Sequence, residues 1–141
     1  MATQFIVDQL GEGAVVAELQ GVTGASAAID RSAGFHCVAD SKLTVVASQT
    51  ANFDRAQGMT VMENMLQANG DIQGVFAAND EMALGALEAI SGANKTVLVV
   101  GFDATDDAIA AVKDGRMAAT VQQQELLPQR EHRCKYPHWQ Q

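Results

Sequence analysis

The sequence has few aromatic residues, few basic residues and only two cysteines, and each shortage narrows the possible functions. Phe, Trp and Tyr make up 5% of the chain, and 9 Lys and Arg are outnumbered by 17 Asp and Glu, for a formal net charge of −8. Such a field repels a nucleic-acid backbone and an anionic membrane surface, so we expect neither as a partner. Cys37 and Cys134 lie in unrelated settings without a Cys-x-x-Cys spacing, which excludes a disulfide scaffold and a familiar zinc site.

Long hydrophobic runs are also absent. No apolar stretch approaches the roughly 20 residues that a membrane span needs. Residues 1–10 lack the basic start and the apolar stretch of a signal peptide. As written, the sequence therefore predicts a chain that stays in the cytoplasm.

The common sequence motifs of enzymes are missing as well. We find no phosphate-binding Gly-x-x-x-x-Gly-Lys-Ser/Thr run, no Gly-x-Ser-x-Gly elbow and no His-Glu-x-x-His, and the glycines at 11–13 and 21–24 lack the full dinucleotide-binding spacing. His36 has no visible acidic partner at a fixed spacing, so a catalytic pair with Cys37 is not expected. The sequence predicts a protein that is not an enzyme and that uses no cofactor and no metal.

What the sequence does contain is enough for one compact domain. The chain has 141 residues, of which 48% are hydrophobic and 18% charged. Its composition changes near residue 124, because residues 1–124 carry 6 basic and 15 acidic groups whereas residues 125–141 carry 3 basic and 2 acidic. We therefore predict one domain over residues 1–124 and an irregular or foreign tail over residues 125–141. In this tail His132, Cys134 and His138 have a spacing that fits no familiar metal site.

The first 124 residues alternate short apolar runs with longer periodic ones. This pattern is typical of parallel strands joined by helices, so we predict an α/β fold, a doubly wound (Rossmann-like) parallel sheet of five strands with helices on both faces. Each strand candidate is almost continuously apolar, as a strand buried on both faces requires. The predicted strands are 14–19, 43–48, 74–78, 96–102 and 118–122, and the predicted helices are 3–10, 25–39, 55–68, 80–91 and 105–114.

Short polar residues mark the starts of the last two predicted helices. Asn79 or Asp80 can cap the helix over 80–91, and Asp103 or Thr105 can cap the helix over 105–114. Acidic side chains in a first turn also complement the helix dipole. We therefore interpret the acidic pairs at 80–81 and 106–107 as helix-start residues, and not as metal ligands or catalytic acids.

Polar side chains gather where the predicted strands end, which is where doubly wound sheets bind their ligands. Arg31, Phe53, Asn79 and Asp103 follow the first four strands, and glutamines at 122–124 follow the fifth. A guanidinium and a carboxylate can bracket neighbouring hydroxyls, amides can donate and accept, and an aromatic ring can cover the C–H face of a sugar. This set favours a polyhydroxyl ligand. Taken singly, Asn79 and Asp103 remain possible helix caps, Arg31 a helix-surface charge, and Phe53 a core residue.

At the same positions the sequence resembles the periplasmic sugar-binding proteins of bacterial ABC importers, and most closely the C-terminal lobe of ribose-binding proteins. The resemblance covers nearly all of residues 1–124. The segments that carry it are ELQGVTGASAAIDRSAGF (18–35), ASQTANFDRAQG (47–58), VFAANDEMALGALEAI (75–90), VLVVGFDATDD (97–107) and DGRMAATVQQ (114–123).

The resemblance implies a function and a set of ligand residues. In that family the lobe offers the sugar an Arg, a Phe, an Asn, an Asp and a Gln, and the matching positions here are Arg31, Phe53, Asn79, Asp103 and Gln123. The implied function is to bind D-ribose or a similar monosaccharide as the substrate-binding component of an importer. By resemblance the location would be the periplasm.

The same resemblance implies a truncated, one-lobed chain. Family members enclose sugar between two lobes, so we expect an N-terminal lobe as partner, a membrane permease as the partner of the complete protein, weak sugar binding by one lobe, and an exposed apolar strip that favours self-association. An alternative is the effector-binding core of a lac-repressor-type transcription regulator, although this sequence shows no basic helix-turn-helix. A nucleotide- or phosphate-handling α/β enzyme is a third reading, which the missing motifs disfavour.

Overall fold

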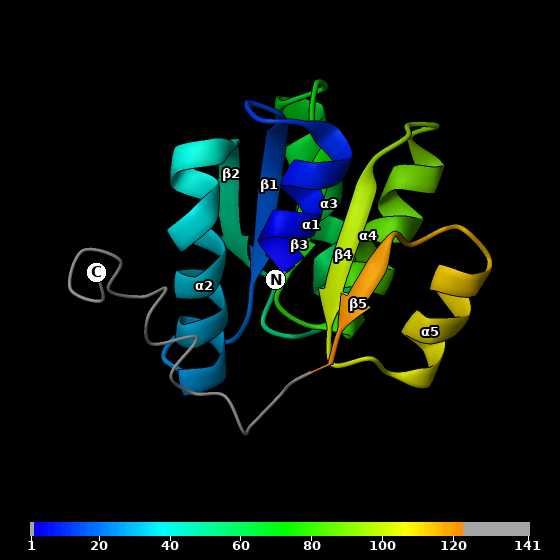
Figure 1. Ribbon diagram of the computed structural model, residues 1–141. Coiled ribbons are helices and arrows are strands. Elements are labelled where there is room, and N and C mark those ends of the chain that lie inside the picture. Colours follow the sequence, from blue (N-terminus) through cyan, green and yellow to red (C-terminus); the bar gives the residue numbers. More distant parts are fainter. Residues whose placement is uncertain (1, 123–141) are drawn as a thin grey trace.

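Strands and helices alternate along the whole of the described chain. The computed structural model describes residues 2–122, in which five strands and five helices follow one another (Figure 1). All ten predicted elements are found, with ends that differ by a few residues. The helices are α1 Ala2–Leu10, α2 Ser26–Lys42, α3 Arg55–Ala68, α4 Asp80–Gly92 and α5 Asp106–Lys113, and the strands are β1 Val15–Gln20, β2 Thr44–Thr50, β3 Gly74–Ala77, β4 Leu98–Phe102 and β5 Ala119–Val121.

The five strands form one parallel sheet in the order β2-β1-β3-β4-β5. The strands β2 and β3 are consecutive in the sequence but lie on opposite sides of β1, so the direction in which strands are added to the sheet reverses between β1 and β3. All strands point downward in Figure 1, so their carboxyl ends meet at the lower edge of the sheet. The predicted fold class is confirmed. In such sheets a crevice for ligands lies at the carboxyl edge, beside the point of reversal.

Helices cover both faces of this sheet, and each face has its own core. Alternate side chains of β1 point to opposite faces, so Val16 packs with Phe35 of α2 on one side, and Leu19 packs with Met62 of α3 on the other. The first face is covered by α1 and α2, the second by α3, α4 and α5 (Figure 1). The methionines of α3 contribute to the second core: Met62 and Met65 are buried, and Met59 packs at the margin.

The two edge strands depart from the prediction that every strand is buried on both faces: β5 has only half-buried residues, and the departure is larger in β2. The strand β2 has alternating exposed and half-buried residues, and Val46 is 37% exposed. Pairing with β1 shifts register here, since Val16 pairs with Val45 and the next residue, Ala17, pairs with Ala47. Val46 is thus an extra residue, a bulge on the open edge of the sheet. Such bulges hinder pairing with another chain.

The helices α3 and α4 touch through their backbones at two glycines. A Cβ added at Gly58 would lie 2.8 Å from the carbonyl oxygen of Met82, and one at Gly85 would overlap the carbonyl oxygen of Arg55 and lie 2.8 Å from the amide nitrogen of Met59. This close approach sets the starts of α3 and α4 side by side at the carboxyl edge. No helix among residues 2–122 has both the length and the apolar character of a membrane-crossing segment.

Candidate sugar-binding site

Four of the five predicted ligand residues lie at the carboxyl edge of the sheet. Arg31 lies in α2, Phe53 precedes α3, Asn79 separates β3 from α4, and Asp103 follows β4. They come from four different connections, so the order of the strands, and not proximity in sequence, brings them to one edge. Gln123 and the tail predicted over residues 125–141 lie outside the described residues.

Arg31 spans the point where the strand order reverses. Its Nη1 donates to the carbonyl oxygen of Ala78 at 2.7 Å, and its Nη2 donates to Asp103 Oδ1 at 3.0 Å. Its Cζ lies 4.1 Å from the centre of the Phe102 ring, which is cation–π distance. With 11% of its side chain exposed, Arg31 is a held guanidinium rather than the helix-surface charge considered above. Phe102 was missed from the sequence, where it is one apolar residue of a predicted strand.

Phe53 sits over the chain that leaves β1. A Cβ at Gly21 would overlap the Phe53 ring, so only glycine leaves room for the ring in this position. The ring centre is 6.0 Å from Arg31 Cζ, and the side chain is half-buried against the margin of the core. Phe53 is therefore a core residue only in part: one part of its side chain packs against the core, and the other part is exposed at the carboxyl edge.

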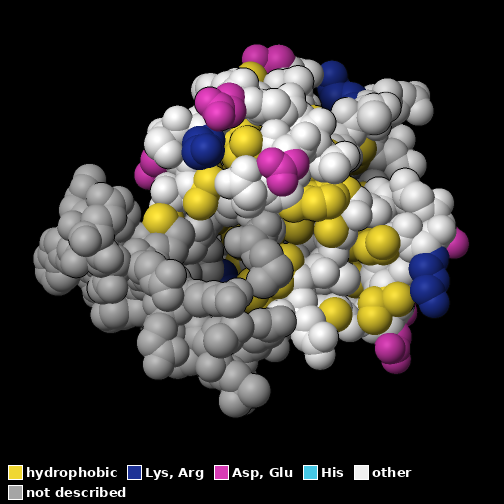
Figure 2. Space-filling view, in the orientation of Figure 1, with side chains coloured by type: hydrophobic (Ala, Val, Ile, Leu, Met, Phe, Trp, Pro, Cys, Tyr) yellow, Lys and Arg dark blue, Asp and Glu magenta, His cyan; other side chains and the backbone are white. Residues whose placement is uncertain are grey.

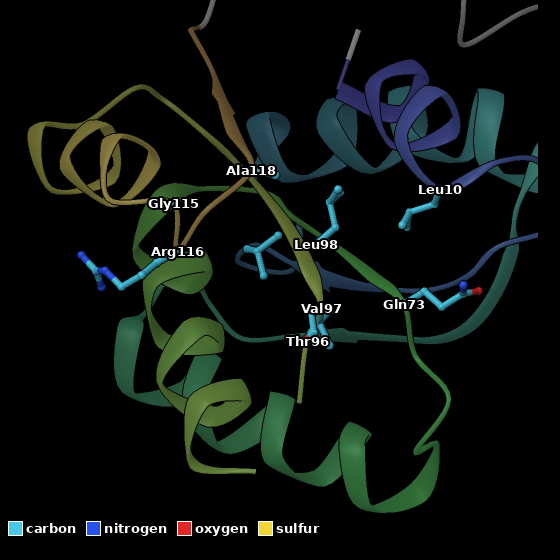
Figure 3. Close-up of a pocket in the computed structure, with 9 residues that line it drawn as sticks. Leu10, Gln73, Thr96, Val97, Leu98, Gly115, Arg116 and Ala118 are labelled. Carbon is cyan, nitrogen blue, oxygen red and sulfur yellow. The ribbon is translucent and has the colours of Figure 1, made fainter. Parts of the chain in front are cut away.

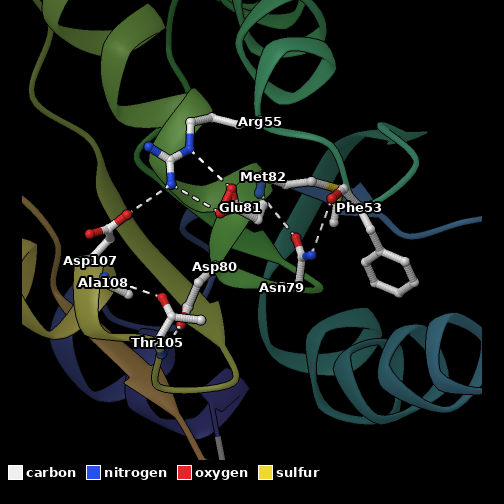
Figure 4. A network of polar contacts seen from close by, with 9 residues as sticks. All are labelled: Phe53, Arg55, Asn79, Asp80, Glu81, Met82, Thr105, Asp107 and Ala108. Carbon is white, nitrogen blue, oxygen red and sulfur yellow. Dashed lines mark hydrogen bonds and ion pairs between the residues drawn. The ribbon is translucent and has the colours of Figure 1, made fainter.

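Asn79 serves as a helix cap. Its Oδ1 accepts the backbone N–H of Met82 at 3.0 Å, and its Nδ2 donates to the carbonyl oxygen of Phe53 at 3.4 Å (Figure 4). The cap interpretation is thus correct for Asn79. The same amide holds the Phe53 loop, which leaves one N–H and the second lone pair of Oδ1 for a ligand.

Asp103 is not a helix cap, since the side chain of Thr105 caps α5 by accepting the N–H of Ala108 at 3.3 Å. The Asp103 side chain is 37% exposed and binds Arg31 through Oδ1. Burial raises the pKa of the Asp103 carboxyl above its ordinary value, the nearby Asp80 carboxylate adds to this, and the Arg31 guanidinium opposes both. The pair offers a ligand an acceptor and a donor next to each other.

The backbone at this edge holds an unusual conformation. Asn52 and Phe53 have φ of 56° and 58°, and Asp103 and Ala104 have φ of 117° and 56°. This left-handed region costs a residue other than glycine about 1–3 kcal/mol, and such strain gathers at functional sites. Two of the four strained residues are predicted ligand residues, which supports a ligand site here.

Sequence reasoning missed an ion triad beside the site. The guanidinium of Arg55 at the start of α3 donates to Glu81 at 2.9 and 3.2 Å and to Asp107 at 3.2 Å, and so ties α3 to α4 and α5 (Figure 4). The interpretation of the acidic pairs at 80–81 and 106–107 as helix-start residues does not account for these contacts of Glu81 and Asp107. No sequence spacing reveals a contact between residues 26 and 52 positions apart.

The expectation that His36 has no acidic partner is wrong. Its Nδ1 lies 2.8 Å from Asp40 Oδ1, one helical turn on, and its Nε2 lies 2.7 Å from Glu18 Oε1. Glu18 is fully buried in β1 and also accepts from Ser48, while its Oε2 has no hydrogen-bond partner among the described residues. The spacing of four between His36 and Asp40 was a signal available in the sequence.

A separate hollow of about 400 Å³ opens at the opposite edge of the sheet (Figure 3). Its lining combines the end of α1 with the segments that enter β3, β4 and β5, and includes Leu10, Gln73, Leu98 and Arg116. Arg116 is bound to Asp114 at 3.3 Å. None of the four predicted ligand residues that the structure describes lines this hollow, so we place the candidate site at the carboxyl edge.

Fold and site together define a class of protein, namely a doubly wound α/β ligand-binding lobe whose polar edge lies at the reversal of strand order. Comparison with known families gives the particular one. The family model described as periplasmic binding protein domain matches residues 1–126, and the chain belongs to this family.

Individual relatives agree with this assignment. The chain is 61% identical over 127 residues to the ribose import binding protein RbsB of Bacillus subtilis, covering 90% of this chain and 42% of that protein. It is 42% identical over 124 residues to the D-allose-binding periplasmic protein of Escherichia coli, covering 84% of this chain and 40% of that protein. A solved ABC transporter periplasmic solute binding protein of Actinobacillus succinogenes with bound D-allose superposes with a TM-score of 0.82 at 35% identity, over 97% of this chain and 48% of that one.

These comparisons bear on the alternatives. The chain spans 40–48% of the length of the relatives just named. They are transport binding proteins, which is consistent with a role other than catalysis and does not favour a lac-repressor-type regulator.

Proposed function

We propose that this chain is a monosaccharide-binding lobe of the substrate-binding component of a bacterial ABC sugar importer, with D-ribose or a close relative as ligand. The observation that carries the proposal is the Arg31–Asp103 pair, 3.0 Å apart beside the reversal of strand order, with the Arg31 guanidinium over the Phe102 ring. A carboxylate that accepts next to a guanidinium that donates suits two neighbouring hydroxyls of a sugar. The half-exposed ring of Phe53 suits the C–H face of the same sugar.

The ligands named for relatives narrow the choice of sugar. Ribose and D-allose, in the names of the relatives above, share the configuration of three consecutive hydroxyl-bearing carbons. We therefore propose a ligand with that arrangement, contacted by Arg31, Phe53, Asn79, Asp103 and Gln123. A periplasmic location is proposed on the same relationship.

The partners that we propose for this chain are based on the greater length of its relatives. Since the chain spans about 42% of the Bacillus protein, we propose that a second lobe completes the site and that a membrane permease receives the sugar from the two lobes together. A single lobe leaves the sugar open to water, where each hydrogen bond contributes only about 0.5–1.5 kcal/mol, so the dissociation constant of this chain for ribose is expected in the millimolar range. We also propose that the lobe self-associates. This proposal is supported by exposed apolar side chains, namely Val22, Ile29 and Ile109, and by the hydrophobic areas in Figure 2.

The proposal is tested by titrating the full chain with D-ribose and following amide signals by two-dimensional NMR. We expect shifts that cluster at Arg31, Phe53, Asn79 and Asp103, and a weaker response to D-arabinose, which differs from ribose at one carbon. Replacing Arg31→Met should weaken binding by at least about 10-fold, the value of one charge-assisted bond. Arg116→Met is the matched control at the opposite edge and should bind ribose as the unchanged chain does. Spectra that ignore ribose and D-allose alike, in a folded chain, would show that this edge is not a monosaccharide site.

A further inference from the structure

Asp80 is a buried carboxylate that the ligand site described above does not use. It is the first residue of α4 and has no exposed surface. Burying a carboxylate is unfavourable unless hydrogen bonds satisfy it, so its partners indicate what it does. Capping of α4 is already performed by the Asn79 side chain, which accepts the N–H of Met82. The role of Asp80 therefore lies outside its own helix.

Both oxygens of Asp80 bind the neighbouring strand and loop. Oδ2 accepts the backbone N–H of Thr105 at 2.7 Å, and Oδ1 accepts the hydroxyl of Thr120 at 2.7 Å. The oxygen of Thr120 in turn accepts the backbone N–H of Ala104 at 3.0 Å. One carboxylate and one hydroxyl thus hold two successive amides of the connection from β4 to α5 (Figure 4 shows the Asp80 side chain reaching toward Thr105).

The sheet is built to admit this carboxylate. A Cβ at Gly101 in β4 would overlap Asp80 Oδ1 and lie 2.5 Å from the methyl group of Met117. Only glycine at this point of the strand leaves the space that the Asp80 side chain occupies. The contact between α4 and the connection after β4 therefore depends on three elements: α4 supplies Asp80, β4 supplies the space at Gly101, and β5 supplies the hydroxyl of Thr120.

The segment held in this way is the strained one. Asp103 and Ala104 have φ of 117° and 56°, directly before the amides that Asp80 and Thr120 bind. The N–H of Asp103 donates to the carbonyl oxygen of Val121 at 2.7 Å, which fixes the other side of the turn. A left-handed residue other than glycine persists only where its surroundings hold it. These contacts keep the Asp103 carboxylate against Arg31.

We propose that Asp80, acting through the backbone N–H of residue 105 and the hydroxyl of Thr120, is a positioning residue for ligand recognition: it fixes the left-handed turn that presents Asp103 to the sugar and to Arg31. This inference rests on the proposed function, and it assigns to the buried acid after Asn79 a role in the site without contact with the ligand. Both hydrogen bonds of its carboxylate go to groups outside α4.

Thr120→Val is the sharpest test, because it keeps the shape of the side chain and removes only the hydroxyl that joins Asp80 to Ala104. Thr120→Ser restores the hydroxyl and should rescue. Thr105→Ala is the matched control, since it removes the cap of α5 and leaves the N–H that Asp80 binds. Asp80→Asn is a second variant, in which a single amide oxygen can satisfy only one of the two donors.

Three quantities are measured on the full chain: the ribose dissociation constant by NMR titration, hydrogen exchange of the Ala104 and Thr105 amides, and the urea midpoint of unfolding. We expect Thr120→Val to raise the dissociation constant by about 5- to 10-fold and to speed exchange at both amides, with Thr120→Ser close to the unchanged chain. Thr105→Ala should lower the urea midpoint and leave the dissociation constant unchanged. Equal weakening of ribose binding by Thr120→Val and Thr105→Ala would overturn the proposal, because it would follow lost stability alone.

Failure of the proposed function is recognised separately. If the unchanged chain ignores ribose, the function fails, and the side-chain N–H signals of Arg31 still report on its pair with Asp103. A shift of those signals in Thr120→Val, together with faster exchange at Ala104, would support positioning of Asp103 by Asp80. Unchanged signals and unchanged exchange would overturn it.

Discussion

Replacing Gly85→Ala tests whether the backbone contact between α3 and α4 is as close as described. Alanine inside a helix is favoured over glycine by about 1 kcal/mol. Against this, the new methyl group would meet the carbonyl oxygen of Arg55 and the amide nitrogen of Met59, 2.8 Å away, and these are backbone atoms that cannot rotate aside. Over-packing of this kind costs about 1–3 kcal/mol, and the rigid neighbours place it at the upper end. The expected net loss is about 2 kcal/mol.

Gly92→Ala is the matched control in the same helix. Nothing lies within 4 Å of a Cβ added at Gly92. Its free energy of unfolding should stay unchanged or rise by about 0.5–1 kcal/mol. Urea unfolding of both variants, followed by circular dichroism, gives the comparison, and thermal unfolding should show Gly85→Ala melting about 4–8 °C lower than the unchanged chain.

The reasoning is refuted if Gly85→Ala is as stable as Gly92→Ala. Such a result would mean that α3 and α4 can move apart without loss, and that the starts of these helices are not fixed relative to one another. The Phe53 loop and Asn79 would then lack the support described above.

Two further predictions concern β1 and the residues that follow it. Burial lowers the pKa of His36, but its hydrogen bond with Asp40 and the charge and hydrogen bond of Glu18 outweigh burial, so the folded-state pKa lies above 6.5. The protonated imidazole therefore contributes its full stabilisation below pH 6.5, and this contribution is lost as the pH rises through the higher folded-state pKa. Urea unfolding at several pH values should show a decrease in the free energy of unfolding of less than about 1 kcal/mol. The variant His36→Gln should abolish this pH dependence. Gly21→Ala should turn the Phe53 ring aside and weaken ribose binding about 2- to 12-fold, with a nearly unchanged free energy of unfolding. NMR titration with ribose measures this effect, with Arg116→Met as the control. Unaltered ribose binding in Gly21→Ala would remove Phe53 from the proposed site.

The order of elements was predictable because apolar runs and helical spacing are local properties. The runs at 74–78 and 96–102 became β3 and β4, both buried, as continuous apolar character requires. The run at 43–48 has the same apolar character but forms an edge strand, since the position of a strand in the sheet depends on long-range order. Its bulge at Val46 likewise depends on pairing with β1.

The candidate site was predictable to the extent that the carboxyl ends of parallel strands share an edge. That rule brings Arg31 and Asp103 together although they are 72 residues apart. It does not reveal Asp80, whose partners lie 25 and 40 residues away and whose sequence position equally suits a helix start. Glu18 was included in a strand treated as apolar, and its buried contact with His36 joins different elements.

The four left-handed residues at the carboxyl edge have a consequence for when the site becomes ordered. Asn52, Phe53, Asp103 and Ala104 take up their conformation as the chain folds, with the connections already fixed by Asn79, Asp80 and Thr120. The loss of conformational entropy at these loops therefore falls within the folding equilibrium and not within binding. A ligand that reaches this edge has little backbone left to immobilise, so its affinity is set by the number of contacts it can make.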